Sequence, residues 1–281
     1  MKIINKPLVS VIIPCYVPGA SIENILKSIR NQTYKKTEII CVDAITRPDK
    51  TIKPFVKKYG GKYLIYGPER SNQRNFGAKN AKGDYFLFLD QDTILSNNII
   101  KECVEAIEKN TMVMIPENSF GEGFWSRAKS FERSMYRGGD VSQGARFFDK
   151  KNFFDVGGYD PDLVGTEDLD LFNKLKNIGV KAVEIKSCIE HDEGRLELGK
   201  ISKRIIYYSK TFLKYKKKYP EISKKQFTLL RPTYFRNWKK MVKNPVLACG
   251  FIILKLVEGF SAFYGMYIKD SWGDYKKEMG E

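Results

Sequence analysis

The sequence is poor in the residues that build disulfide and zinc frameworks. It contains one histidine, and its five cysteines form no closely spaced pair: Cys15, Cys41, Cys103, Cys188 and Cys249. Neither a disulfide framework nor a cysteine zinc site is therefore indicated, and a reducing, cytoplasmic setting fits best. The first apolar run is broken by Pro14 and is followed by no small-residue cleavage site, so it predicts a strand and not a signal peptide.

Acidic residues are nearly absent from residues 195–243. This segment holds sixteen Lys or Arg against two glutamates, and so carries nearly all of the net charge of +16. The stretch that follows, "NPVLACGFIILKLVEGFSAFYGMYIKD", is strongly apolar, yet Lys255 and Glu258 interrupt it and make it a poor spanning helix. We expect a first domain over residues 1–196, and a helical appendage over residues 197–281 that faces a membrane or a partner.

Strand-like and helix-like segments alternate in the first domain. "LVSVIIPCY" and "TEIICVDA" are short apolar β runs, and "SIENILKSIRNQ" between them repeats apolar residues at helical spacing after a Ser21 cap. The order recurs through "PFVKKYGGKYLIYG", "SNQRNFGAKNAKGD" and "YFLFLD". Successive βα units predict an α/β fold with a mainly parallel central sheet flanked by helices. The 281 residues, 42% of them hydrophobic, are enough for that core and an appendage.

The strand "YFLFL" runs directly into two carboxylates, Asp90 and Asp92. Ligands of parallel sheets bind at the carboxyl ends of the strands, and two carboxylates there would repel unless a cation lay between them. Oxygen ligands favour Mg²⁺ or Mn²⁺, held jointly with substrate phosphates. The alternative is that Asp90 caps the next turn while Asp92 is solvated, because acids commonly follow strands.

Six stretches in one order extend this interpretation: "VSVIIPCY", "SIRNQTY", "EIICVDA", "QRNFGAKNAKGDYFLFLDQD", "GGYDPDL" and "GTEDLDL". Together they resemble the signature of the inverting family-two glycosyltransferases with the GT-A, Rossmann-like nucleotide-sugar fold, over roughly residues 7–200. The resemblance implies transfer of a sugar from a UDP- or GDP-sugar to an acceptor. Val17 and the stretch "VDAITRPDKT" depart from the family pattern, which leaves the nucleotide open.

The resemblance also implies roles for residues of the donor site. Pro14 and Tyr16 would line the nucleotide pocket, and Asp43 would accept a hydrogen bond from the base. Strand-end packing and an Asx turn are the alternatives for these three. Arg74 would hold the nucleotide or pyrophosphate side, unless it forms a salt bridge to a neighbouring acid.

Three residues would form or adjoin the metal site in such a family member. Asp90 would contact the ribose or the metal, Asp92 would bind the metal that bridges the diphosphate, and His191 would be a further ligand. Nitrogen coordination suits Mn²⁺ somewhat better than Mg²⁺. The alternative is that His191 is a polar residue at the surface or a packing residue. The stretch "HDEGRLELGK" resembles a membrane-associated subgroup, in which acceptor-side or diphosphate contacts would come from Asp192, Glu193 and Arg195.

Acceptor activation would depend on the stretch "GTEDLDL". The family pattern makes Asp168 the base that takes the proton from the attacking hydroxyl, with Glu167 orienting the acceptor or the helix end. The alternative is an acidic first helical turn favoured by the helix dipole, with Thr166 as its cap. Gly144 and Ala145 would permit close approach of the acceptor, or relax a turn. The preceding "SFGEGFWSRAKSFERSMYRGG" would be a mobile loop or helix that closes over the acceptor.

The basic-aromatic stretch "ISKRIIYYSKTFLKYKKKYP" suits an anionic membrane surface. We therefore expect a peripheral protein on the inner face of the cell membrane with a lipid-linked glycan as acceptor. A buried helix hairpin, or a homodimer through the same apolar face, is the alternative. A nucleic-acid-binding protein would leave the ordered motifs unexplained, so no nucleic-acid partner is expected. A sugar nucleotidyltransferase would carry a basic, glycine-rich phosphate loop, and "PCYVPGASIEN" has no basic residue.

Overall fold

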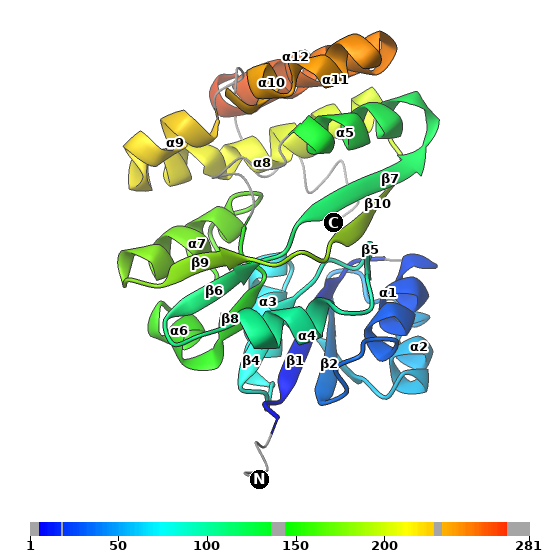
Figure 1. The fold of residues 1–281 in the computed structure, drawn as a ribbon, viewed down its shortest axis with the longest axis vertical. Coiled ribbons are helices and arrows are strands. Elements are labelled where there is room, and N and C mark those ends of the chain that lie inside the picture. The colour runs from blue at the N-terminus through cyan, green and yellow to red at the C-terminus, as the bar shows by residue number, and fades with distance from the viewer. Residues whose placement is uncertain (1–5, 18, 136–143, 228–231, 269–281) are drawn as a thin grey trace. The chain divides into compact units, whose positions relative to one another are not determined.

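The computed structural model describes residues 6–17, 19–135, 144–227 and 232–268 (Figure 1). The chain divides into two compact units. Unit 1 comprises Met1–Glu117, Gln143–Pro161 and Glu167–His191, and unit 2 comprises Asn118–Ser142, Asp162–Thr166 and Asp192–Glu281. The chain finally leaves unit 1 at His191, close to the predicted division at residue 196. Unit 2 also takes in residues 118–142 and 162–166, which lie inside the range predicted for the first domain.

Unit 1 contains a seven-stranded sheet in the order β3-β2-β1-β4-β8-β6-β9. Its strands are β1 (Val9–Cys15), β2 (Thr37–Asp43), β3 (Lys62–Ile65), β4 (Tyr85–Phe88), β6 (Thr111–Met114), β8 (Phe147–Asp149) and β9 (Lys181–Glu184). Strands β1 to β4 pair in parallel, whereas β8 runs antiparallel to both β4 and β6. The predicted mainly parallel sheet is confirmed. All seven residues of β1 are buried, as expected for a central strand covered on both faces.

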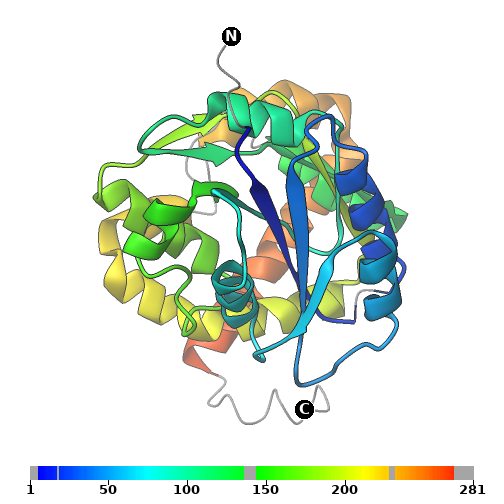
Figure 2. The same cartoon turned by 90° about the horizontal axis from the view of Figure 1, so that it is seen from below.

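Helices cover both faces of this sheet (Figure 2). One face packs against α1 (Ser21–Arg30), α2 (Ile52–Lys58) and α4 (Ile99–Ala106), and the other against α3 (Arg70–Lys79), α6 (Lys150–Asp155) and α7 (Glu167–Asn177). Helix α3 approaches β1 closely, because a Cβ added to Gly77 would lie 2.5 Å from Cγ2 of Ile12. The predicted Ser21 cap is wrong: Ala20 is the N-cap of α1, and Ser21 is the first residue of the helix.

A second, three-stranded sheet has the order β5-β10-β7. Strand β5 (Thr93–Leu95) lies in unit 1, while β7 (Glu117–Glu122) and β10 (Ile189–Arg195) begin in unit 1 and end in unit 2. Within unit 1, β10 pairs antiparallel with β5 and places His191 opposite Thr93. This pairing brings the only histidine next to the predicted acidic motif.

The described residues of unit 2 outside these strands are mainly helical. It contains α5 (Gly123–Met135), α8 (Leu198–Lys218), α9 (Pro220–Gln226), α10 (Pro232–Arg236), α11 (Trp238–Lys243) and α12 (Pro245–Tyr267). Helix α12 packs against α8 and α5. Its contact face includes small residues that allow close approach, since Gly250 meets the ring of Phe124 and Gly265 meets Ser209. The segment predicted to close over an acceptor begins in strand β7 and continues as helix α5 up to Met135, and residues 136–143 lie outside the described residues.

Helix α12 is long and apolar enough to cross a membrane by length and composition, and 28% of its most apolar window is buried. The charges that made it a poor spanning helix on sequence grounds, Lys255 and Glu258, pair with each other at 2.5 Å. They also pair with Glu132 and Lys129 of α5. Two lysines and two glutamates thus neutralise one another on the packed side of α12, and its other side remains apolar.

Candidate active site

The carboxyl ends of β1, β2 and β4 meet at one edge of the unit 1 sheet. Cys15 pairs with Asp43, and Ile12 pairs with Phe88 just before the acidic motif. Pro14 is buried in β1, and Tyr16 follows the strand at the same edge. The predicted donor-site residues are therefore brought together by the parallel register.

Gln91, between the two acids of the motif, ties this edge to the end of β1. Its side-chain oxygen accepts from the backbone N–H of Tyr16 at 2.7 Å, and its amide donates to the Tyr16 carbonyl at 3.0 Å. Thr93 closes the turn by donating its hydroxyl to the carbonyl of Asp90 at 2.7 Å. These bonds hold the loop that carries Asp92 in one position.

Asp43 is fully buried, and both of its oxygens accept hydrogen bonds. The Tyr63 hydroxyl and the backbone N–H of Asp49 donate to Oδ2, each at 2.7 Å, and the Ala44 N–H donates to Oδ1 at 3.0 Å. Burial raises the pKa of Asp43, although these donors act in the opposite direction. Asp43 thus shapes the loop after β2, and its contact with a base stays a prediction.

Arg74 lies at the centre of the site with 1% of its side chain exposed. Its Nη2 is 2.7 Å from Oδ1 of Asp90, and its Nη1 is 3.1 Å from Oδ1 of Asp168 and 3.3 Å from Oε1 of Glu167. The Tyr159 ring covers the guanidinium at 5.0 Å. Burial opposes the charge on Arg74, yet the surrounding acids hold its pKa well above the usual value. The salt bridge named as the alternative for Arg74 is present and joins the two predicted acidic motifs.

Asp168 opens the first turn of α7 and keeps 40% of its side chain exposed. Burial of the carboxyl raises its pKa, Arg74 lowers it, and Glu167 and Asp90 raise it further. The backbone of Gly144 lies against it, since a Cβ at that position would be 2.9 Å from Cβ of Asp168. A fixed carboxylate that binds protons more readily than an ordinary aspartate is suited to a general base.

Asp92 and His191 form the second part of the site. His191 Nε2 lies 3.4 Å from Oδ2 of Asp92, and Nδ1 lies 3.8 Å from Oε2 of Glu117. Oδ1 of Asp92 is buried and has no hydrogen-bond partner among the described residues. A carboxylate with one unpaired oxygen and the other near an imidazole nitrogen fits a divalent cation that takes its other ligands from water and phosphate.

No group of three or more His, Cys, Asp or Glu side chains is arranged to hold a metal ion within the described ranges. Asp90 explains part of this, because its two oxygens face two guanidinium groups, those of Arg74 at 2.7 Å and Arg146 at 3.1 Å. Burial raises the pKa of Asp90, but the positive charges of Arg146 and Arg74 hold this pKa well below its usual range. Asp92 and His191 are therefore the pair that fits a metal, and the metal contact of Asp90 stays a prediction.

Sequence reasoning missed Arg146 and Glu117, which pair with each other and link the two parts of the site. Arg146 is the single charge in the apolar run "GARFF", and Glu117 follows the strand "TMVM" much as Asp90 follows β4. Both signals were available. Acids and bases alternate without a break along what we call the charge chain: Asp168, Arg74, Asp90, Arg146, Glu117, His191 and Asp92.

Two residues predicted to contact the acceptor or the diphosphate, Asp192 and Glu193, accept hydrogen bonds from groups of unit 2. Glu193 accepts from Arg133 at 2.9 Å and from Ser119 at 3.1 Å, and Asp192 accepts from the N–H of Gly194 at 2.8 Å. The predicted Thr166 cap is wrong, because the Thr166 hydroxyl bonds to no described group.

Comparison with known proteins agrees with this geometry. The family described as "Glycosyl transferase family 2" matches residues 10–164. An uncharacterised glycosyltransferase of Haemophilus influenzae is 29% identical over 119 residues, which cover 41% of this chain and 48% of that protein. The poly(ribitol-phosphate) beta-N-acetylglucosaminyltransferase TarP of Staphylococcus aureus is 26% identical over 153 residues, covering 52% and 46%. The chain thus spans about half the length of these two relatives.

Solved structures show the same fold at low identity. The mannosyltransferase PcManGT of Pyrobaculum calidifontis, in complex with GDP-Man and Mn²⁺, superposes with a TM-score of 0.67 at 15% identity, over 94% of this chain and 88% of that chain. TarS residues 1–349 of S. aureus, in complex with UDP, superposes with a TM-score of 0.51 at 16% identity, over 93% of each chain.

Proposed function

Because the chain belongs to glycosyl transferase family 2, we propose that it transfers a sugar, with inversion, from a nucleoside-diphosphate sugar to an acceptor hydroxyl or phosphate. The observation that carries the proposal is the position of Arg74, which holds Asp90 and Asp168 on one buried guanidinium. The donor would be a UDP- or GDP-sugar, since TarS was solved with UDP and PcManGT with GDP-Man.

In this proposal the donor diphosphate lies at the sheet edge beside Asp92. Asp92 and His191 would hold a divalent metal, Mn²⁺ or Mg²⁺, which when bound stabilises the charge of the departing diphosphate. Glu117 faces the other nitrogen of His191, so it orients the imidazole towards Asp92. Gln91 fixes the loop between them through its two bonds to Tyr16.

Asp168 takes the proton from the attacking acceptor hydroxyl. Its raised pKa increases its strength as a base, and Arg74 keeps its carboxylate in place at 3.1 Å. Glu167 is held by Arg70 at 3.0 Å as well as by Arg74 and fixes the start of α7. A carboxylate held in this way loses little conformational entropy when it reaches the reactive geometry.

The acceptor in this proposal is a lipid-linked glycan on an anionic membrane. Support comes from α12, whose outer side exposes large apolar residues, among them Val246, Phe260 and Tyr267. The preceding helices carry most of the sixteen basic residues of segment 195–243, and each Lys or Arg near an anionic surface adds about 1 kcal/mol. Co-sedimentation with phosphatidylglycerol vesicles should be strong at low salt and weaken at high salt. Equal binding to neutral vesicles would contradict an electrostatic contribution to membrane binding.

The donor site is tested by calorimetry with a panel of UDP- and GDP-sugars, with and without Mn²⁺. Wild type should bind one nucleotide family in a metal-dependent way, and Asp92→Ala should lose that dependence. Asp162→Ala, which removes an acid of unit 2 with 72% of its side chain exposed, is the matched control and should bind like wild type. No binding of any diphosphate sugar would reject the proposed function.

A further inference from the structure

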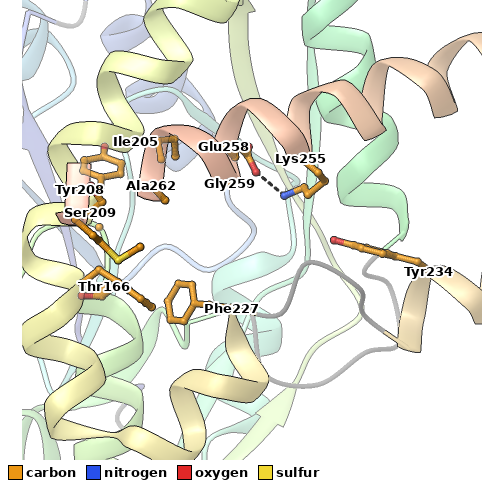
Figure 3. Close-up of a pocket in the computed structure, with 13 residues that line it drawn as sticks. Thr166, Ile205, Tyr208, Ser209, Phe227, Tyr234, Lys255, Glu258, Gly259 and Ala262 are labelled. Carbon is orange, nitrogen blue, oxygen red and sulfur yellow. Dashed lines mark hydrogen bonds and ion pairs between the residues drawn. The ribbon is translucent and has the colours of Figure 1, made fainter. Parts of the chain in front are cut away.

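Unit 2 contains a cavity of about 450 Å³ between α8 and α12 (Figure 3). Its wall is mainly apolar and includes Ile205, Phe212, Phe227, Ala262 and Met266. This volume and lining are typical of a site for a small or chain-like apolar ligand with a few polar groups that orient it. The cavity is distinct from the charge chain, whose residues all lie in unit 1.

One polar group in the cavity wall lacks a partner. The Thr166 hydroxyl is buried, lines the cavity and makes no hydrogen bond to the described residues, and 4% of Thr166 is exposed. A buried hydroxyl without a partner has lost its hydrogen bonds to water, so a ligand group that bonds to it is favoured there. This orphan hydroxyl indicates where the polar end of a ligand would lie.

Chain connectivity ties this end of the cavity to the proposed base. Thr166 precedes Asp168 by two residues, and two residues span at most about 7 Å. A phosphate head group bonded to Thr166 would therefore lie within a short distance of the proposed site of transfer. The apolar part of the same ligand would extend along the cavity towards Phe227 and Ala262.

Helix α12 links the cavity to an apolar environment. Its residues Ala262 and Met266 line the cavity, while its neighbours Phe260 and Phe263 are exposed at 73% and 54%. A hydrocarbon chain leaving a bilayer would exchange one apolar surface for another, so it could enter the cavity without exposing its CH₂ groups to water. A freely soluble polar acceptor would gain nothing from this lining.

We propose that the cavity between α8 and α12 binds the hydrocarbon chain of a lipid phosphate, with its phosphate end at Thr166. The inference rests on the proposed function, because it makes that lipid the carrier of the acceptor. The cavity would be a binding site in unit 2 that recognises the hydrocarbon chain of the lipid independently of the donor.

The test is calorimetric binding of farnesyl phosphate to the full-length protein. Wild type should bind farnesyl phosphate and farnesol but not inorganic phosphate. Ala262→Trp, which fills the cavity, should weaken both by about tenfold or more. Cys249→Trp, which introduces the same indole at an exposed position of α12 outside the cavity, should leave both unchanged. Thr166→Val should weaken farnesyl phosphate about fivefold and leave farnesol unchanged.

A second measurement does not depend on folded variants. A diazirine analogue of farnesyl phosphate should label wild-type peptides from α8 and α12, and excess farnesyl phosphate should suppress the labelling. Labelling confined to other peptides, or equal binding by Ala262→Trp and wild type, would overturn the inference. Donor binding is measured in the same samples: if it persists while the lipid results fail, only the cavity assignment falls, and if it is absent the proposed function itself is wrong.

Discussion

Replacing Arg146 by Met should destabilise unit 1, because two largely buried acids, Asp90 and Glu117, each lose a positively charged partner. The Arg146 side chain is 15% exposed, and it pairs with Asp90 at 3.1 Å and with Glu117. Methionine conserves much of the side-chain volume. In this variant Glu117 would still face His191, and Asp90 would still pair with Arg74. The effect is therefore electrostatic in origin and not a consequence of a cavity.

The magnitude follows from the burial of these groups. Removing one partner of a fully buried pair costs about 3–5 kcal/mol. Since Asp90 retains its 2.7 Å contact with Arg74 and none of the three groups is fully excluded from solvent, we expect about 2–3 kcal/mol for Arg146→Met. Lys151→Met provides the matched control. It breaks an exposed pair whose side chains are 80% and 44% accessible, and should cost no more than about 0.5 kcal/mol.

Urea unfolding of a double-mutant cycle measures the coupling directly. Glu117→Gln removes the negative charge that Arg146→Met deprives of its guanidinium partner, so the double variant should be about 1–2 kcal/mol more stable than the sum of the two single effects predicts. A cost for Arg146→Met equal to that of Lys151→Met, together with additive single effects, would refute the charge chain as a stabilising network.

Three further predictions concern catalysis, packing and metal binding. Asp168→Asn should lower kcat about 10²–10⁴-fold with unchanged donor affinity. In the wild type, the acid limb of kcat/KM should lie above pH 3.8, because the pKa of Asp168 is raised above that value and the base is lost as pH falls through the raised pKa. Gly77→Ala should destabilise the protein in urea by about 1–3 kcal/mol, because its Cβ would lie 2.5 Å from Ile12, whereas Gly199→Ala, with open space around it, should not. Glu117→Gln should weaken Mn²⁺ binding in the presence of nucleotide about 10–100-fold in calorimetry, and unchanged affinity would exclude its orienting role.

Much of the architecture could be predicted because its signals are local. The buried run "VSVIIPC" forms the central strand, and the helical periodicity of "SIENILKSIR" forms α1, with only its cap misplaced by one residue. Strand order was harder to predict, since β8 enters antiparallel between β4 and β6. That insertion depends on the partners of a three-residue strand and leaves no periodic signal in the sequence.

The acidic motifs were found because each follows an apolar run or opens a helix. Their pairing with Arg74 was foreseen only as an alternative, and Arg146 was missed because a single arginine before a strand is common at protein surfaces. The charged residues of α12 show the same limit. Lys255 and Glu258 read as interruptions of an apolar helix until their pairing with Glu132 and Lys129 is known.

The sequence by itself determined the apolar strands, the helices between them and the presence of carboxylates at strand ends, since these depend on the spacing of neighbouring residues. Only the tertiary structure decided which charges meet. Asp168 and Arg74 are separated by 94 positions in the chain, and Asp90 and Arg146 by 56. Contacts over such separations form only when the whole sheet and its helices are packed, because no local interaction can bring those side chains within hydrogen-bond distance.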